Sequence, residues 1–480
     1  MSDIRPLLIH GKWVKDTAAT IRSVNPATGA ENYQVAAASA QTVAQAVSSS
    51  RKAAASSGWR QMLPHQRGRL IARLADVVAS RCEDFAKAQM LENGKPLSEC
   101  RAQAAAAESI YRYYAAVCET TGSDLTPSRG NYLSMTTFEP YGVVAAITPW
   151  NSPLTMEAQK VAAALAAGNA VILKPSEVTP SCALELGRAA LDAGLPPGIL
   201  NVLSGTGIEA GQALVCHPDV RMVSFTGGTH SGRQIARLAA DKLMPVALEL
   251  GGKSPHIVFA DADLDAAAAS VAGGIFEGSG QSCVAGSRLF VQRKCYEAVV
   301  DKVVQHARQL VLGLPESSAT QMGPMASFQH RDRVEQFVAS ARAEGGQILT
   351  GGGRPDQDAL QAGAYFEATV IAGLPNSATV CQQEIFGPVL CVLPFDDEDD
   401  LVAQANDSAY GLAAGIWTGN FPRAWRVAQR LEAGTVWINT YKQLSIATPF
   451  GGYKDSGLGR EKGISGMRLY QQQKSLYWGL

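Results

Sequence analysis

Short apolar runs alternate with helical stretches between residues 142 and 250, and this rhythm constrains the fold more than any other feature of the chain. Strands that are each followed by a helix indicate a parallel, doubly wound α/β sheet. Helices are expected near residues 155–168, 181–193, 207–215 and 230–240. The strand-like runs are GVVAAIT, NAVIL, GILNVLS, RMVSFT and PVALEL.

Polar and glycine-rich segments stand where four of these strands end: TPWN, KPSE, SGTG and TGGTHSG. In open parallel sheets, ligands bind beyond the carboxyl ends of the strands. We therefore predict a ligand site along this edge. The last segment differs from the usual G-x-G-x-x-G dinucleotide fingerprint, so it does not identify the ligand by itself.

The rest of the chain is organised around this sheet. The first 120 residues are expected to be helical, because apolar residues recur at helical spacing in 38–59, 64–95 and 95–119. A Thr-, Tyr- and Ser-rich stretch over 125–142 predicts a hairpin that leaves the main body, and a second α/β section follows from about 255 to 450. A length of 480 residues favours two or three domains.

The balance of charge and apolar residues excludes several classes of function. Forty-two basic residues face 43 acidic ones, and the net charge of -1 gives no reason to expect nucleic acid or an anionic membrane as a partner. No window approaches 18 uninterrupted apolar residues, and MSDIRPLLIHGKWV lacks the basic and apolar regions of a signal peptide. Nine scattered cysteines without a C-x-x-C pair argue against a disulfide framework and a metal site, and favour a cytoplasmic location.

Cys283 has unusual neighbours for a cysteine. In FEGSGQSCVAGSRLF it is surrounded by small and polar residues, just ahead of an expected strand. Most free cysteines are buried and inert, so a small apolar residue at a tight turn is one interpretation. The other is a nucleophile that needs backbone N–H groups nearby.

Five segments together resemble the aldehyde dehydrogenase superfamily over roughly residues 5–478. The matching motifs are ELGGKSP, GQSCVAGSRLFV, EIFGPV, NDSAYGLAAGIWT and PFGGYKDSGLGRE. The resemblance implies a Rossmann-like doubly wound cofactor domain, a second α/β catalytic domain and a small β oligomerisation extension. It places the NAD-binding domain at 1–120 and 141–250, the catalytic domain at 251–450, and the extension at 121–140 and 466–480.

The resemblance also implies a reaction. Cys283 matches the nucleophile, and Asn151 matches the side chain that stabilises the negative oxygen of the thiohemiacetal. Glu249 matches the general base that activates water to cleave the thioester, although a structural glutamate in a turn is the alternative. Branches that transfer the acyl group to coenzyme A lack this glutamate, so release of the free acid is favoured. Acyl transfer to coenzyme A and a non-catalytic structural or binding relative remain alternatives. A Cys–His hydrolase has little support.

A cofactor site follows from the same comparison. Lys174 and Glu177 match residues that hold the adenosine ribose, and a carboxylate there would repel a 2′-phosphate, which favours NAD over NADP. Gly228 stands where many relatives have serine, so one hydroxyl contact to the diphosphate is expected to be missing. Glu384 matches the residue that holds the nicotinamide ribose, with Phe386 nearby. The complete predicted set is Trp150, Lys174, Ser176, Glu177, Gly207, Phe225, Gly228, Leu250, Glu384 and Phe386.

The predicted substrate pocket is more polar than that of relatives that oxidise simple aliphatic aldehydes. Ser152 and Gln159 replace bulky aromatic residues, and Phe450 matches an aromatic that packs against the substrate. Lys442 lies at the expected mouth, where it would either pair with a substrate carboxylate or be solvated. The complete predicted set is Ser152, Gln159, Ser282, Lys442, Leu444 and Phe450.

Two further expectations come from the resemblance. Lys160 and Glu461 match a pair that forms a proton route to the general base in some relatives, with a structural ion pair as the alternative. The hairpin and the C-terminal strand match elements through which subunits associate, so a homodimer or homotetramer is expected. Gln472 replaces a glutamate that anchors this interface in some relatives.

Overall fold

The predicted parallel strands form the centre of an eight-stranded sheet in the computed structural model, which describes residues 4–15 and 19–480. Five parallel strands have the order 3-2-1-4-5 along the chain, which is that of a Rossmann-like fold. Antiparallel strands β22 (Gly457–Leu458), β2 (Leu7–Ile9) and β3 (Lys12–Val14) complete its edges. The parallel strands are β10 (Leu200–Val202), β9 (Ala170–Lys174), β8 (Val143–Ile147), β11 (Met222–Thr226) and β12 (Val246–Glu249).

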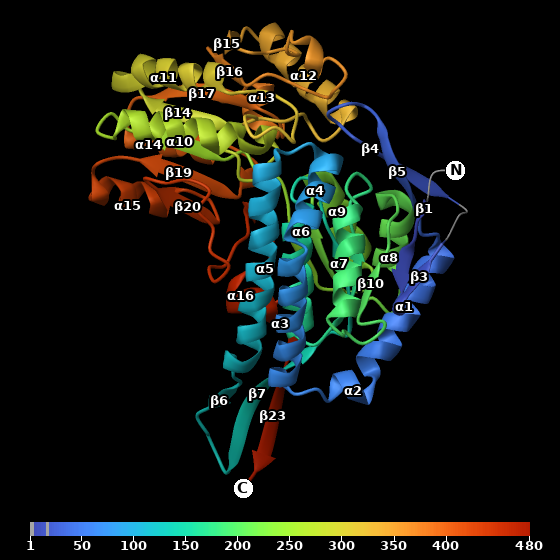
Figure 1. Cartoon of the computed structure of the whole chain (residues 1–480). Helices are drawn as coiled ribbons and strands as arrows, with labels where there is room; N and C mark the ends of the chain where they lie inside the picture. The colour runs from blue at the N-terminus through green and yellow to red at the C-terminus, as the bar shows by residue number, and fades with distance from the viewer. Residues whose placement is uncertain (1–3, 16–18) are drawn as a thin grey trace.

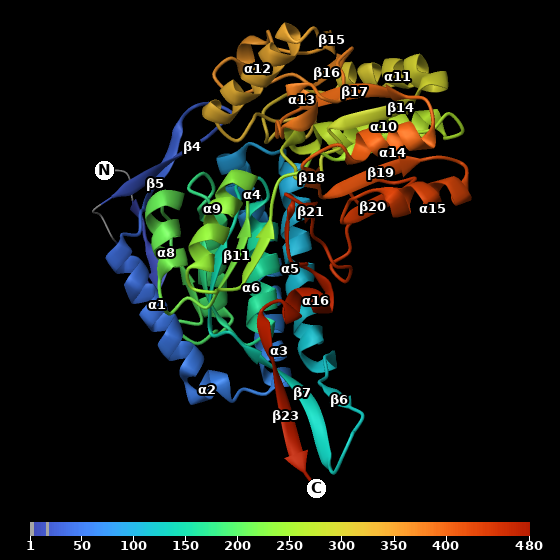
Figure 2. The ribbon, with the colours of Figure 1, turned by 180° about the vertical axis from the view of Figure 1, so that it is seen from behind.

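Helices cover both faces of this sheet, which explains why its strands are continuous apolar runs (Figures 1 and 2). Every residue of β8, β9 and β11 is buried. One face packs against α3 (Pro64–Ser80), α4 (Cys82–Asn93), α5 (Leu97–Thr120), α6 (Pro153–Ala166) and α7 (Ser181–Asp192). The other packs against α1 (Ala40–Ala55), α8 (Gln212–Cys216) and α9 (Thr229–Ala240).

A second, seven-stranded sheet confirms the predicted α/β section after residue 255. Its strands are parallel except at one edge, where β15 and β16 are antiparallel. Its order is β15 (Gln347–Thr350), β16 (Thr369–Ala372), β17 (Val389–Phe395), β14 (Arg288–Gln292), β13 (Pro255–Val258), β19 (Ala413–Trp417) and β20 (Thr435–Ile438). The helices of this section are α10 (Leu264–Phe276), α11 (Tyr296–Gln309), α12 (Phe328–Ala343), α13 (Thr379–Gln382), α14 (Glu398–Asn406) and α15 (Phe421–Arg430).

The expectation of helices throughout the first 120 residues is wrong for the N-terminal part. Strands β1 (Ile4–Arg5), β4 (Thr20–Val24) and β5 (Glu31–Ala36) form a separate three-stranded sheet, and β2 and β3 extend the large sheet. The turn between β4 and β5 contains Pro26 and Gly29, whose φ of 75° is a left-handed conformation that glycine adopts readily. Helical structure begins only at α1.

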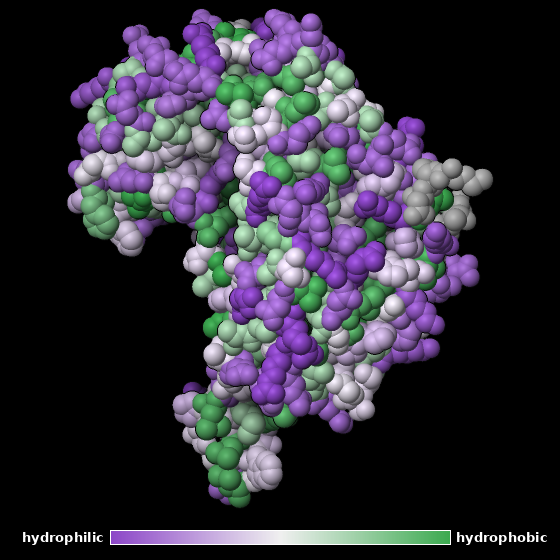
Figure 3. Space-filling view, in the orientation of Figure 1, coloured by the Kyte–Doolittle hydropathy of each residue, from purple (hydrophilic) through white to green (hydrophobic). Residues whose placement is uncertain are grey.

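The predicted hairpin projects from the main body, as Figures 1 and 2 show. It consists of β6 (Asp124–Thr126) and β7 (Tyr132–Pro140), and β7 pairs along its whole length with β23 (Gln471–Gly479). The C-terminal strand therefore begins later than residue 466, because α16 (Gly463–Arg468) precedes it. Hydrophobic side chains, drawn green, gather on this extension in Figure 3. Its exposed large side chains include Leu125, Tyr477 and Trp478. No helix in the described part of the chain is long and apolar enough to cross a membrane.

Candidate active site around Cys283

A left-handed turn leads into the loop that carries Cys283. Gly278, Ser279 and Gly280 have φ angles of 65°, 57° and 70° in succession. Side chains disfavour this conformation, which explains two of the glycines in the segment. At Gly280 a Cβ atom would also lie 2.1 Å from the carbonyl oxygen of Gly387. The small residues of this segment therefore allow a turn that larger residues would prevent.

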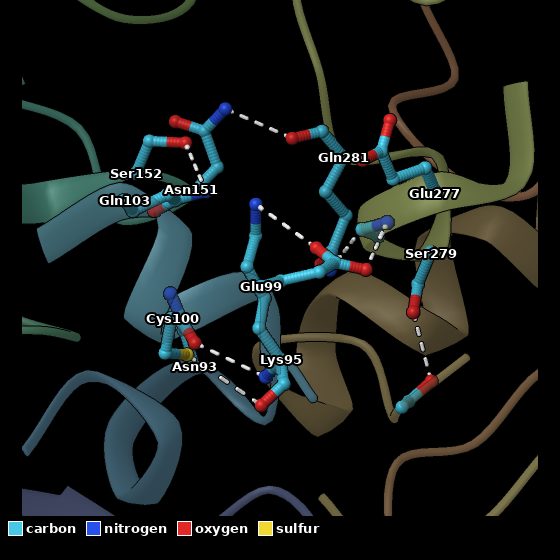
Figure 4. Close-up of polar contacts among 12 residues, drawn as sticks. Asn93, Lys95, Glu99, Cys100, Gln103, Asn151, Ser152, Glu277, Ser279 and Gln281 are labelled. Carbon is cyan, nitrogen blue, oxygen red and sulfur yellow. Dashed lines mark hydrogen bonds and ion pairs between the residues drawn. The ribbon is translucent and has the colours of Figure 1, made fainter. Parts of the chain in front are cut away.

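Side chains from the start of α5 and from neighbouring loops hold this turn (Figure 4). The Glu99 Oε1 atom accepts the N–H of Gly278 at 3.1 Å, and its Oε2 lies 3.8 Å from the Lys95 ammonium. Ser279 donates to the Gly323 carbonyl at 2.8 Å, and the Gln281 Oε1 atom accepts the N–H of Ala326 at 2.8 Å. Sequence analysis missed Glu99, because its helix gave no sign of a contact with a loop that follows far later in the chain.

Asn151 links the first sheet to this loop. It follows β8, and its amide Nδ2 donates to the Gln281 carbonyl at 2.8 Å (Figure 4). Since the amide has two N–H groups, one remains for another acceptor. Ser152 next to it accepts a hydrogen bond from Gln103 at 3.3 Å. The structure thus places both predicted residues at the junction of the two sheets, beside the cysteine loop.

Glu249, the last residue of β12, also lies at this junction. A Cβ atom on Gly451 would lie 2.9 Å from the Oε1 atom of Glu249. A Cβ atom on Gly252 would lie 2.3 Å from the carbonyl oxygen of Cys283. Within the described residues, neither oxygen of the Glu249 carboxyl has a hydrogen-bond partner. Burial raises its pKa well above the usual value, and the charge of Glu461 raises it further. A carboxyl of raised pKa and without a partner suits a general base.

Cys283 is partly buried and packs against an apolar cluster that contains Phe450. Removal from water raises its pKa to about 12, and the nearby carboxyls of Glu384 and Glu249 raise it as well. The positive charge of Lys462 lowers the pKa of this thiol. The thiol is therefore protonated at neutral pH and needs a base, or a change in its surroundings, before it reacts as a nucleophile.

Lys160 and Glu461 form the buried ion pair that the sequence suggested. The Lys160 Nζ atom lies 2.5 Å from Glu461 Oε1 and donates to the hydroxyl of Ser224 at 3.0 Å. Gln159 also donates to the Glu461 carboxylate. Gln159 is thus buried and engaged with the ion pair, a role different from that predicted for a residue of the substrate pocket.

The predicted adenosine-side residues follow β9 and β10. Lys174 is buried, its Nζ donates to the Pro175 carbonyl at 2.8 Å, and the Glu177 Oε2 lies 3.9 Å away. Burial lowers the pKa of Lys174, and Glu177 opposes this effect. Ser176 is buried beside them, whereas the Glu177 side chain is half exposed. Gly207 is exposed, and a Cβ atom on it would meet open space.

The predicted nicotinamide-side residues converge on the other side of β12. The Glu384 Oε1 atom accepts the N–H of Gly252 at 2.9 Å, and burial raises the pKa of this carboxyl to about 7. Phe386 makes an edge contact with Trp150, with ring centroids 5.3 Å apart. Two further residues of the predicted set, Phe225 and Leu250, are buried next to Gly227 and Gly232.

The carboxyl edge of the first sheet has the groups that a dinucleotide requires. Thr148, Ser204 and Thr226 follow or end three parallel strands, and their buried hydroxyls have no partner in the described part of the protein. The N-terminus of α9 has no side-chain cap, because its N-cap residue is Gly228, and a Cβ atom there would meet open space. Uncapped N–H groups at a helix start favour an anion such as a diphosphate. These residues therefore fit a dinucleotide.

The predicted residues at the mouth are only partly available to a ligand. The Lys442 ammonium lies 3.3 Å from Glu277 Oε2 and 3.4 Å from the Gly273 carbonyl. Leu444 is half exposed, whereas Phe450 is buried and Ser282 is partly buried next to Cys283. In the described residues, no group of His, Cys, Asp and Glu side chains could hold a metal ion.

A doubly wound sheet whose ligand edge faces a cysteine loop from a second sheet defines the class of dehydrogenases that work through a thiol. The model of the aldehyde dehydrogenase family matches residues 13–476. The chain belongs to this family.

Individual relatives are similar over nearly their full length. Betaine aldehyde dehydrogenase 1 of Rhizobium meliloti (strain 1021) is 40% identical over 475 residues, which cover 98% of this chain and 96% of the relative. An aldehyde dehydrogenase from Bacillus cereus, solved in complex with NAD+, is 40% identical and has a TM-score of 0.97. The match covers 100% of this chain and 97% of the Bacillus cereus chain. Betaine aldehyde dehydrogenase from Staphylococcus aureus, also solved with NAD+, is 36% identical and has a TM-score of 0.97. The match covers 99% of this chain and 95% of the Staphylococcus aureus chain.

Proposed function

We propose that this chain oxidises an aldehyde to the free carboxylic acid with NAD, using Cys283 as nucleophile, Asn151 as oxyanion donor and Glu249 as general base. The observation that carries the proposal is the convergence of these three side chains, from three separate segments, at the junction of the two sheets. Family membership supports the class of reaction.

The first step is attack of the Cys283 sulfur on the aldehyde carbon. The thiol proton must leave, and the unpartnered carboxyl of Glu249 is a nearby acceptor when it is ionised. The aldehyde oxygen becomes negatively charged, and the free N–H of the Asn151 amide and the backbone N–H of Cys283 can donate to it. One such donor typically contributes about 3–4 kcal/mol to lowering the barrier.

NAD, when bound, would supply the acceptor for the hydride of the thiohemiacetal carbon, and Cys283 would then carry a thioester. Lys174 and Glu177 would hold the adenosine ribose, the start of α9 the diphosphate, and Glu384 the nicotinamide ribose. The half-exposed Glu177 carboxylate would repel a 2′-phosphate, which supports NAD over NADP.

Hydrolysis completes the cycle. Glu249 removes a proton from a water molecule, the water oxygen attacks the thioester carbon, and the Cys283 sulfur leaves as the acid forms. The buried pair of Lys160 and Glu461 would then carry the proton away from Glu249. The presence of Glu249 favours this route over transfer of the acyl group to coenzyme A.

We also propose a homodimer or homotetramer that associates through the extension of residues 121–140 and 471–480. The exposed apolar residues at its tip support this role, because such patches commonly mark interfaces. The first sheet, with residues 1–120 and 141–250, would form the NAD-binding domain, and residues 251–450 the catalytic domain. Nine free cysteines support a reducing location such as the cytoplasm.

The test is a panel of aldehydes with NAD or NADP, with and without coenzyme A, followed by the absorbance of the reduced cofactor. We expect NAD-dependent oxidation that does not need coenzyme A, and its loss in Cys283→Ala while NAD still binds. A requirement for coenzyme A, or a tenth of the activity remaining in Cys283→Ala, would contradict the proposal.

A further inference from the structure

Lys462 is a buried lysine beside the active site that the mechanism above does not use. Only 8% of the residue is exposed. Its φ of 61° and ψ of 170° lie in a region that is essentially restricted to glycine, so the surroundings must hold it there. The following Gly463 donates to the Ile446 carbonyl at 2.7 Å, and the Lys462 carbonyl accepts the N–H of Gly466 at 2.7 Å.

The ammonium of Lys462 lies over the ring of Phe450, with its Nζ atom 5.0 Å from the ring centroid. Phe450 belongs to the apolar cluster against which Cys283 packs, and its backbone exchanges two hydrogen bonds with Glu461, at 2.8 and 2.7 Å. The ammonium therefore lies beside the nucleophile, over an aromatic ring that would flank the aldehyde.

Among the described residues, the positive charge of Lys462 lacks the carboxylate partner that Lys160 and Lys442 have. Lys160 is paired with Glu461 at 2.5 Å, and Lys442 with Glu277 at 3.3 Å. Lys462 makes no ion pair or side-chain hydrogen bond with any residue in 4–15 or 19–480, although Cys283, Glu461 and Glu249 face it at longer range. A lysine that is largely buried and has no carboxylate partner is unfavourable, so a bound anion would stabilise its charge.

We propose that Lys462 binds the carboxylate of the substrate, and that the preferred substrates are short oxo acids, in which a carboxylate lies a few carbon atoms from the aldehyde. This inference rests on the proposed function, because it requires Cys283 to attack the aldehyde. It assigns to Lys462 the role that the sequence suggested for Lys442, whose ammonium is already paired with Glu277. It also disfavours a cationic substrate, because the face of Phe450 already carries an ammonium and like charges repel.

Three aldehydes of different charge test the inference: 4-oxobutanoate, butanal and betaine aldehyde, each with saturating NAD. We expect the unmodified chain to have a kcat/KM at least about 10-fold higher for 4-oxobutanoate than for butanal. Lys462→Met should lower kcat/KM for 4-oxobutanoate by about 10- to 100-fold, mainly through KM, which is the range for a lost charged hydrogen bond. The value for butanal should change by less than about threefold, and that for betaine aldehyde should rise.

Lys454→Met is the matched control, since it removes a lysine that already has a partner, Glu432, and that belongs to none of the predicted sites; it should change each value by less than about threefold. Lys462→Arg keeps the charge and should retain most of the preference for 4-oxobutanoate. Melting temperatures and NAD titrations establish that each variant is folded.

The outcomes separate this inference from the proposed function. An equal loss on butanal and 4-oxobutanoate in Lys462→Met would mean that the ammonium serves the thiol, and no loss on 4-oxobutanoate would mean that it does not contact the substrate. Either result overturns the inference while aldehyde oxidation stands. Failure of the unmodified chain to oxidise any aldehyde would contradict the proposed function, and the inference with it.

Discussion

Replacing Glu249 by glutamine should separate the two halves of the reaction. Hydride transfer needs Cys283 and Asn151, whereas a general base is needed chiefly when water attacks the thioester. The amide has nearly the same size as the carboxyl but cannot accept a proton from water. The Glu249 carboxyl makes no hydrogen bond with the residues that the structure describes, so we expect the substitution to change the free energy of unfolding by less than about 1 kcal/mol.

The expected magnitudes differ for the two steps. Loss of a general base typically lowers the rate of the step it serves by about 10²- to 10⁴-fold, so thioester hydrolysis should become rate-limiting by that factor. The substitution removes an acceptor for the thiol proton, but it also removes a negative charge that raises the pKa of the Cys283 thiol. Formation of the thioester should therefore remain fast enough to be resolved from its hydrolysis.

Rapid mixing with NAD and an aldehyde is the assay. We expect a burst of about one NADH per active site, followed by slow turnover, and mass spectrometry of the quenched protein should detect the acyl group on Cys283. A slow burst of full amplitude would mean that Glu249 also helps to deprotonate the thiol. The absence of both burst and acyl adduct would refute the division of roles, since Glu249 would then be required before hydride transfer.

Three further predictions concern the groups around this centre. Glu177→Gln should shift the NAD/NADP ratio of kcat/KM toward NADP by about 5- to 30-fold, because one negative charge near the 2′-position is removed; steady-state kinetics with both cofactors measure this ratio. Lys160→Met should lower the free energy of unfolding by about 3–5 kcal/mol, measured with urea, because it leaves the Glu461 carboxylate buried without its partner. Glu249 acts when it is ionised, and burial and Glu461 raise its pKa, so the rate of thioester hydrolysis should fall as the pH drops through this raised pKa. Glu461→Gln should lower the pKa of Glu249 and move the acidic limb of the pH–rate profile to lower pH. An acidic limb that does not move would contradict the assignment of Glu249 as the base.

The sequence predicts the two central sheets because their strands are buried on both faces and therefore consist of continuous apolar runs. The short N-terminal strands give no such signal. Their pairing partners, such as β10 for β2, lie far away in the chain, so the local periodicity of the sequence cannot predict this pairing.

The candidate site divides in the same way. Cys283, Glu249 and Asn151 stand in recognisable motifs at the ends of predicted strands. The contacts of Glu99 with Gly278 and of Lys462 with Phe450 depend on how separate segments meet in space. Lys442 illustrates the limit most directly, since the resemblance predicts that it lies at the mouth of the pocket but gives no sign of its pairing with Glu277.

The hydroxyl of Ser224 connects the buried ion pair of Lys160 and Glu461 to the residue that precedes the C-terminal strand. It accepts hydrogen bonds from Lys160 at 3.0 Å and Tyr470 at 2.9 Å, and it donates to Glu461 at 3.1 Å. Tyr470 directly precedes β23, the strand with the exposed apolar tip. These hydrogen bonds, together with the peptide bond from Tyr470 into β23, join Glu461, which raises the pKa of the general base, to the strand through which subunits would associate. We expect the acidic limb of the pH–rate profile to move when the protein is diluted until the subunits dissociate. The pKa of Glu249 in one subunit would then depend on whether that subunit is bound to its neighbours.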